Sequence, residues 1–352
     1  MYEDQTGRIV GRRESRSFRI TRGTKQGDPI SPQLFNAVLQ EAVETLRKQW
    51  VARGWGIRIG PFNEDSLLNL RFADDLLLFA KSLKVLKKMM TELQTAVGKV
   101  GLHLHMGKTK ILCNAKGRRQ SHAKTMNLDG EDVEILTSTD STKYLGRALA
   151  FYEYHDREIR NRITAGWAKF TSYKTELCNR RIPFERRLKL FNAVVTPTVL
   201  YGSCCWTMTV ERERSLKVAR RRMLRKVVQV VRQKDDKNAD GLEDWVTYII
   251  RATQETEKIS EDNGVADWVL EQRRRKWKWA GHVARMEDRR WTNLALLWCP
   301  SGQRAVGRPT KRWEDSLEQF AGEQLSGRNW ISVAKDRTAW AALEKTYVKH
   351  CG

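Results

Sequence analysis

The sequence lacks the features of a membrane-spanning protein and of a disulfide-stabilised one. No apolar run approaches the roughly 20 residues that a spanning helix needs, and the N-terminus, MYEDQTGRIVGRRES, has no apolar segment typical of a signal peptide. Its six cysteines show no CxxC pair and no repeated spacing, so neither a zinc site nor a disulfide framework is expected. We therefore expect mostly buried thiols in a reducing compartment, and no membrane partner.

Acidic side chains are fewer than basic ones. The 352 residues include 42 Asp and Glu and 65 Lys and Arg, which gives a formal net charge of +23. A surplus of this size predicts a polyanionic partner, and nucleic acid is the commonest one. A membrane surface is the rival interpretation, but it requires a lipid-facing element to accompany the charge. Tryptophan, in contrast, is abundant: seven of the 13 lie from Trp277 onward, which separates a C-terminal part from the rest.

The first 150 residues alternate between helical and strand patterns. Apolar residues at helical spacing follow Ser31, which we expect to be the N-cap, with Pro32 at the first helical position. A second amphipathic helix runs from about residue 83 to 100 and ends at Gly101. Strands are predicted at 67–72, 76–80, 110–113, 133–136 and 143–145. This order is typical of an α+β domain, not of βαβ units.

From residue 151 onward the pattern becomes helical and basic. We expect a helical segment at 185–206 that breaks at Pro197, and one long helix at 211–231. Residues 233–240 are polar and are predicted to be a linker, and a helical segment around Trp245 and a polar patch at 255–264 precede the last part. The predicted divisions are 1–150, a helical region at 151–232, a linker with one helix at 233–264, and a basic, Trp-rich helical domain at 265–352.

Two adjacent carboxylates, Asp74 and Asp75, interrupt the apolar stretch LRFADDLLLF at residues 70–79. Phosphoryl transfer from a nucleoside triphosphate uses carboxylates that hold two divalent ions about 4 Å apart. A tight hairpin is a good support for such a pair, because its strands fix the carboxylates in place. The alternative is an acidic hairpin turn without a ligand.

A basic, glycine-containing loop, RGTKQGDPISP, lies about 50 residues upstream at 22–32 and leads directly into the first helix. Glycine lets the backbone approach a ligand closely, and a helix N-terminus favours anionic groups. An ordinary helix-entry turn is the alternative. Downstream come GLHLHMGKTK at 101–110 and KYLG at 143–146.

These four motifs, in this order and at these separations, resemble the palm of a reverse transcriptase, specifically that of the non-LTR (LINE-type) retrotransposons. The resemblance implies an α+β fold with a partial palm, in which helices pack on a small antiparallel sheet, followed by an all-α thumb and a helical basic tail. It implies an RNA-directed DNA polymerase that uses Mg²⁺ (or Mn²⁺), an RNA template, a DNA primer and deoxynucleoside triphosphates. A nuclear or cytoplasmic location is expected for such a product.

The resemblance also assigns roles to individual residues. Asp74 and Asp75 would be the metal ligands and catalytic carboxylates, while Phe72 replaces the tyrosine more often found beside them. Lys108 would act as general acid on the leaving pyrophosphate; the alternative is a solvated lysine. Template and nucleotide contacts would come from Arg22, Gln26 and Gly27, and the primer grip would be formed by Tyr144, Leu145 and Gly146.

The resemblance continues more weakly past the palm. Residues 185–206 resemble the helical thumb, and the segments WKWAGHVARM (277–286) and GRPTKRWED (307–315) are similar to the tails of such polyproteins. Interleaved Arg, Lys and Trp are typical of single-strand binders. Trp313 and Trp340 are nevertheless expected in the core because of their helical positions, and His282 is expected to be structural.

One metal-binding aspartate of the resembled family comes from a strand upstream of the Gln26–Gly27 loop. Only 25 residues precede Gln26, and Asp4, the only aspartate among them, lies in a polar setting. We therefore expect the C-terminal part of a polymerase, with little or no extension activity in this chain alone. The alternative is a catalytically inactive nucleic-acid-binding remnant or domesticated fragment.

Overall fold

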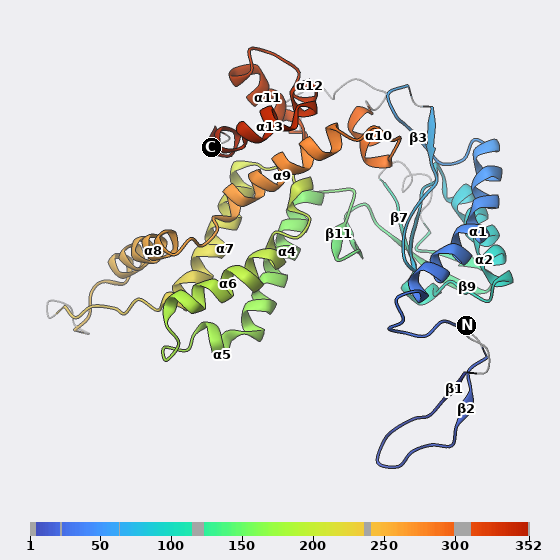
Figure 1. The fold of residues 1–352 in the computed structure, drawn as a ribbon, viewed down its shortest axis with the longest axis horizontal. Helices are drawn as coiled ribbons and strands as arrows, with labels where there is room; N and C mark the ends of the chain where they lie inside the picture. Colours follow the sequence, from blue (N-terminus) through green and yellow to red (C-terminus); the bar gives the residue numbers. More distant parts are fainter. Residues whose placement is uncertain are drawn as a thin grey trace. The chain divides into compact units, whose positions relative to one another are not determined.

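The computed structural model describes residues 5–21, 23–62, 64–114, 123–235, 241–298 and 311–350. The chain divides into two compact units, Met1–Ser138 and Thr139–Gly352 (Figure 1). The first unit is mixed, with helices and small sheets, and the second is almost entirely helical. The chain is therefore of mixed α and β structure, in agreement with the α+β class predicted from the sequence.

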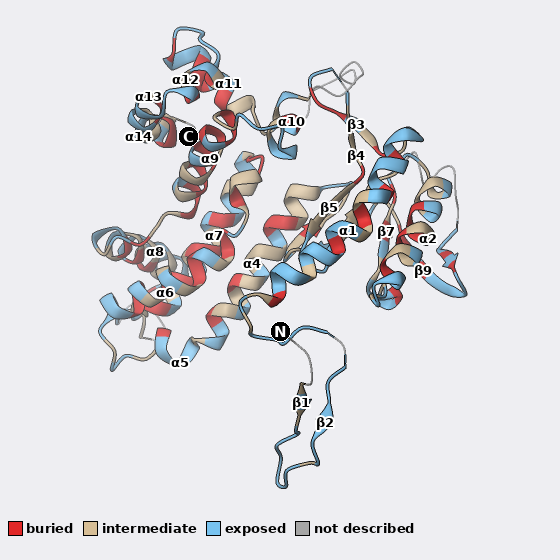
Figure 2. Ribbon diagram, turned by 45° about the vertical axis from the view of Figure 1, so that its right-hand side comes forward, coloured by how far each residue is buried: buried red, intermediate tan, exposed pale blue. Residues whose placement is uncertain are grey.

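Two long helices, α1 (Ser31–Ala52) and α2 (Leu83–Lys99), support the first unit. Each turns one apolar face inward, as the sequence spacing predicts, and the two faces meet in one core. Figure 2 shows this buried stripe along α1. Trp50 is fully buried, and its indole nitrogen donates a 2.7 Å hydrogen bond to Glu92 of α2. The buried residues of this core are Leu39, Val43, Leu46, Trp50, Leu68, Met89, Leu93 and Val97.

Ser31 does not cap α1 as expected, because it is the first residue of the helix itself. Ile30 before it already has helical backbone angles, and the Ser31 hydroxyl donates a 2.7 Å hydrogen bond to the carbonyl of Lys25. The serine therefore ties the preceding loop to the helix instead of capping its free N–H groups. The end of α2 is as predicted: Val100 is the C-cap, and Gly101 follows with φ of +76°.

The strands of the first unit form small sheets. Three are antiparallel hairpins, in which β1 (Thr6–Gly7) pairs with β2 (Phe18–Arg19), β3 (Ile57–Ile59) with β4 (Asp65–Leu67), and β5 (Asn69–Phe72) with β6 (Asp75–Leu78). The fourth sheet has the order β7–β9–β8, with β7 (Lys110–Leu112), β8 (Thr125–Leu128) and β9 (Glu131–Leu136). Since β7 runs parallel to β9, this sheet is mixed and not purely antiparallel.

The second unit begins with a hairpin of β10 (Thr142–Tyr144) and β11 (Arg147–Leu149). The helices that follow are α4 (Tyr154–Ser172), α5 (Lys174–Leu177), α6 (Phe184–Val199), α7 (Val210–Val228), α8 (Trp245–Asp262) and α9 (Trp268–Ala284), and the C-terminal helices come after them. Helices α4, α6, α7 and α9 share one buried core. Its largest members include Phe191, Trp206 and Trp268.

One expectation for this region is wrong. Helix α6 is not broken at Pro197 but continues through it and ends at Val199, because a proline in the last turn removes one hydrogen bond of a helix that is about to end. Most of the polar patch at 255–264 forms the second half of α8.

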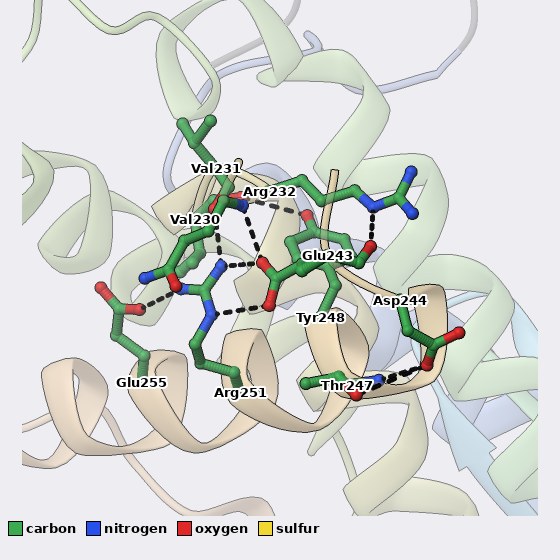
Figure 3. A network of polar contacts seen from close by, with 10 residues as sticks. Val230, Val231, Arg232, Glu243, Asp244, Thr247, Tyr248, Arg251 and Glu255 are labelled. Atoms are coloured by element: carbon green, nitrogen blue, oxygen red, sulfur yellow. Dashed lines mark hydrogen bonds and ion pairs between the residues drawn. The ribbon is translucent and has the colours of Figure 1, made fainter. Parts of the chain in front are cut away.

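A polar network fixes the start of α8 to Val230 and Val231, which follow α7 in the chain (Figure 3). Glu243 is 7% exposed and accepts hydrogen bonds from the guanidinium of Arg251. Arg251 also donates to the carbonyl of Val231 at 2.8 Å, and the Tyr248 hydroxyl donates to that of Val230 at 3.0 Å. These bonds connect α8 to the chain on the other side of residues 236–240.

The C-terminal helices pack on α9 around stacked tryptophans. They are α10 (Trp291–Leu297), α11 (Asp315–Gln324), α12 (Trp330–Lys335), α13 (Arg337–Ala342) and α14 (Glu344–His350). The Trp277 and Trp340 rings stack with centroids 3.5 Å apart, and each indole nitrogen donates to the other residue's carbonyl at 3.0 Å. The core position expected for Trp340 is confirmed, and Trp313 packs half-buried against the same cluster. Within the described ranges, no helix is both long and apolar enough to cross a membrane.

Candidate functional site

Asp74 and Asp75 lie at the tip of the β5–β6 hairpin. Phe72 and Asp75 form its closing pair, so Ala73 and Asp74 are the two loop residues. Both carboxylates are exposed, and neither side chain has a hydrogen bond or ion pair with another described residue. Ala73 has φ of +51°, a left-handed conformation that is costly for a residue with a Cβ. The turn thus holds two free carboxylates on a backbone that is locally strained.

The hairpin stands on the α1–α2 core. Leu76 and Leu78 pack against that core, and Arg71 donates a hydrogen bond to Gln40 of α1. The backbone N–H of Phe79 donates to the carbonyl of Leu68 at 2.8 Å. In residues 70–79 the apolar side chains on the inner face pack on the core, and the two carboxylates lie at the tip of the hairpin. This explains why the stretch contains both apolar and charged residues. The carboxylates are therefore presented by a fixed support.

The loop before α1 presents Gln26 and Gly27 to solvent. Gly27 has φ of +91°, which a residue with a side chain rarely adopts. The turn is held from both sides: the Asp28 N–H donates to the Lys25 carbonyl at 3.3 Å, and the Ser31 hydroxyl donates to that same carbonyl. Arg22, the third expected template contact, lies outside the described residues.

Lys108 ends a short 3-10 helix, Met106–Lys108, and its side chain is exposed. Met106 is buried and anchors this turn in the core beneath β7 and β9, and the Thr109 hydroxyl donates to the His105 carbonyl at 3.0 Å. Lys108 is thus held at the surface of the same unit as Asp74.

Asp74 and Asp75 lie together as sequence neighbours on one turn. Gln26, Gly27 and Lys108 lie on other elements of the same unit. Across the described part of the chain, no group of three or more His, Cys, Asp or Glu side chains could hold a metal ion. The aspartate pair is consequently an incomplete ligand set on its own, and Asp4 lies outside the described residues.

Tyr144, Leu145 and Gly146 form the tip of the β10–β11 hairpin, which belongs to the second unit. The boundary between the two units follows Ser138, so these three residues come after it in the chain. Leu145 and Gly146 have φ of +49° and +74°, the pair of left-handed residues that a two-residue type I′ turn requires. The Tyr201 hydroxyl donates to the Leu145 carbonyl at 3.1 Å, and Arg162 of α4 donates to the Gly146 carbonyl.

A buried carboxylate, Glu158 of α4, holds this hairpin from beneath. It is fully buried and accepts a 2.6 Å hydrogen bond from the N–H of Ala148. Arg147 and Arg162 lie 3.4 and 3.6 Å from the same carboxylate oxygen. A charge this deeply buried requires such partners. Sequence reasoning missed Glu158, although its spacing of four from Arg162 on a predicted helix was a signal.

Comparison with known proteins agrees with the motifs. Residues 1–149 match the family described as reverse transcriptase (RNA-dependent DNA polymerase). An uncharacterized transposon-derived protein of Caenorhabditis elegans is 32% identical over 289 residues, which are 80% of this chain and 96% of that protein.

Two retrovirus-related Pol polyproteins are also similar. The polyprotein of the type-1 retrotransposable element R2 of Popillia japonica is 30% identical over 197 residues, 54% of this chain. That of the type-2 element R2DM of Drosophila melanogaster is 32% identical over 138 residues, 38% of this chain. The matched regions span only 25% and 12% of those polyproteins. The chain belongs to the reverse transcriptase family of non-LTR retrotransposons.

Proposed function

We propose that this chain supplies part of the active site of an RNA-directed DNA polymerase, with Asp74 and Asp75 as metal ligands. The observation that carries the proposal is the pair of exposed, unpartnered carboxylates on a fixed hairpin, inside the region that matches the family. Carboxylate oxygens are the ligands that Mg²⁺ prefers, so the donor set fits Mg²⁺ or Mn²⁺. When bound, two such ions stabilise the attacking and leaving oxygens of the transferred phosphoryl group.

The other residues of the first unit would position the substrates. Gln26 and Gly27 would contact the template strand and the incoming deoxynucleoside triphosphate, because both residues are exposed in the loop before α1. Lys108 would give a proton to the pyrophosphate as it leaves, since an ammonium can donate to an oxygen that gains charge. In the second unit, the turn at 144–146 would contact the DNA primer.

The first test is primer extension on an RNA template with Mg²⁺, using the 352-residue chain. We expect weak extension, because the described residues supply two of the carboxylates and no third beside them. Asp74→Asn should abolish what extension there is, since it removes a charged ligand without changing the size of the side chain.

Asp129→Asn is the matched control. Asp129 is exposed and occupies the left-handed position of the β8–β9 turn, with φ of +51°, so the substitution makes the same chemical change in another hairpin of the same unit. It should leave extension unchanged. Robust extension that survives Asp74→Asn would show that the hairpin is not the site.

A non-enzymatic nucleic-acid-binding role is the second candidate. The observation that favours it is the incomplete ligand set within the described residues, together with the charge of +23. This role predicts that the chain binds RNA in a salt-dependent way and that Asp74→Asn does not weaken this binding. It also predicts no primer extension under any condition.

A further inference from the structure

A hollow of about 320 Å³ lies in the second unit, between α9 and the turn that follows α6. One wall is the segment from Leu200 to Cys204, and the other is a stripe of α9 formed by Arg275, Lys278, Trp279 and His282. Residues spaced by three or four lie on one helix face, so these side chains border the hollow together. Ligand sites begin at about 300 Å³, which gives room for one small group.

The α9 wall combines cations with an aromatic ring. Trp279 is half-buried, with its ring centroid 5.5 Å from that of His282. The Lys278 side chain is 64% exposed, and its nearest carboxylate, Glu344, is 3.9 Å away. Arg275 is held more firmly, because it donates to both the Leu200 carbonyl and Glu271.

The opposite wall is fixed and contains an unsatisfied hydroxyl. Gln272 donates to the carbonyl of Ser203 at 3.1 Å, and Trp313 donates to that of Cys204 at 2.7 Å. Ser203 is 1% exposed, yet its hydroxyl has no hydrogen-bond partner among the described residues. A buried polar group without a partner costs free energy, but this oxygen is inaccessible to solvent and therefore does not contact a ligand in the hollow.

We propose that this hollow binds one nucleotide of a single-stranded nucleic acid. The base would stack on Trp279, and Lys278 would contact an adjacent phosphate, the combination by which single-strand binders hold their ligands. A strand fits better than a free nucleotide because Lys278 is 64% exposed and Arg274, one turn before it on α9, is a further cation outside the lining of the hollow. Arg274 is 42% exposed and is paired with Glu271 and Glu344. The proposal goes beyond the polymerase function, since the hollow involves none of the residues assigned to it.

The test measures binding of a short labelled oligothymidylate to the full chain by fluorescence anisotropy. EDTA is present and no deoxynucleoside triphosphate is added, so metal chemistry at Asp74 does not contribute. Trp279→Ala should weaken binding roughly tenfold or more, as expected for one stacked base, and Trp279→Phe should retain most of the affinity. Lys278→Ala should lower the slope of log affinity against log salt by about 0.7, the value for one phosphate contact on a single strand.

Two controls match these variants within the same unit. Trp245→Ala removes another exposed tryptophan (60% exposed), and Lys258→Ala removes another exposed lysine, both from α8. Neither should alter affinity or slope as the α9 variants do. Equal effects in the α8 and α9 variants would overturn the proposal. So would an unchanged affinity in Trp279→Ala, or displacement of the strand by free thymidine monophosphate, which would indicate a mononucleotide site.

Discussion

Cys204 and Cys205 show how neighbouring residues determine the chemistry of a single side chain. Their sulfur atoms lie 3.7 Å apart, and both thiols are half-buried. The hydrogen bond with Cys204 lowers the pKa of Cys205, burial opposes this, and the positive charge of Arg147 lowers it further. The same bond and burial raise the pKa of Cys204. The pair therefore ionises as a unit, with one proton lost early.

Alkylation by iodoacetamide should report this early ionisation. We expect the rate for the pair, measured by mass spectrometry, to reach half its maximum at a pH below the ordinary thiol value of about 8.5. Cys204→Ala removes the hydrogen-bond donor and should move the midpoint upward, while Cys178→Ser, which changes a half-buried thiol on α5's C-terminal side, should not. An unchanged midpoint in Cys204→Ala would contradict the assignment.

At the scale of elements, the β10–β11 hairpin depends on α4 more than on its own two short strands. Glu158→Ala removes the carboxylate that Ala148, Arg147 and Arg162 share. Breaking a buried ion pair from one side costs about 3–5 kcal/mol, so the free energy of unfolding, measured with urea, should fall by roughly that amount. Glu176→Ala in α5, where the glutamate is exposed, should change it by less than about 0.5 kcal/mol. Equal losses in both would show that Glu158 is not a structural anchor.

The elements that could be predicted from sequence are those whose signal is local. Apolar spacing gave α1 and α2, and the positions of β5 and β6 followed from the runs on either side of Asp74 and Asp75. This pair was the part of the candidate site that could be predicted, because two carboxylates on consecutive residues lie on the same turn whatever the rest of the fold. The burial of Glu158 and the bond from Tyr201 to the turn at Leu145 arise from contacts 10 and 56 residues apart. The spacing of Glu158 and Arg162 indicates a pair on one helix face, but no local pattern shows that the hairpin packs on this pair.

At the scale of the molecule, the chain has separate cores and an uneven charge. Residues 139–352 hold 42 Lys and Arg against 27 Asp and Glu, so this unit carries most of the net charge of +23. The α1–α2 core of the first unit and the α4–α9 core of the second share no buried residue. A basic second unit with its own core is consistent with binding to nucleic acid in its own right.

Because the two units have separate cores, we expect a substitution that destabilises one unit to leave the other folded. Leu93 and Leu188 are 1% and 0% exposed, one in each core, and truncation of a buried leucine to alanine costs about 2–5 kcal/mol. In hydrogen exchange read by mass spectrometry, Leu93→Ala should reduce the protection of α1 and α2 while α6 and α7 keep theirs, and Leu188→Ala should do the reverse. Each variant thus serves as the other's control. Loss of protection in all four helices from either substitution would mean that the chain unfolds as one cooperative body, and its two cores would then have to be treated as one.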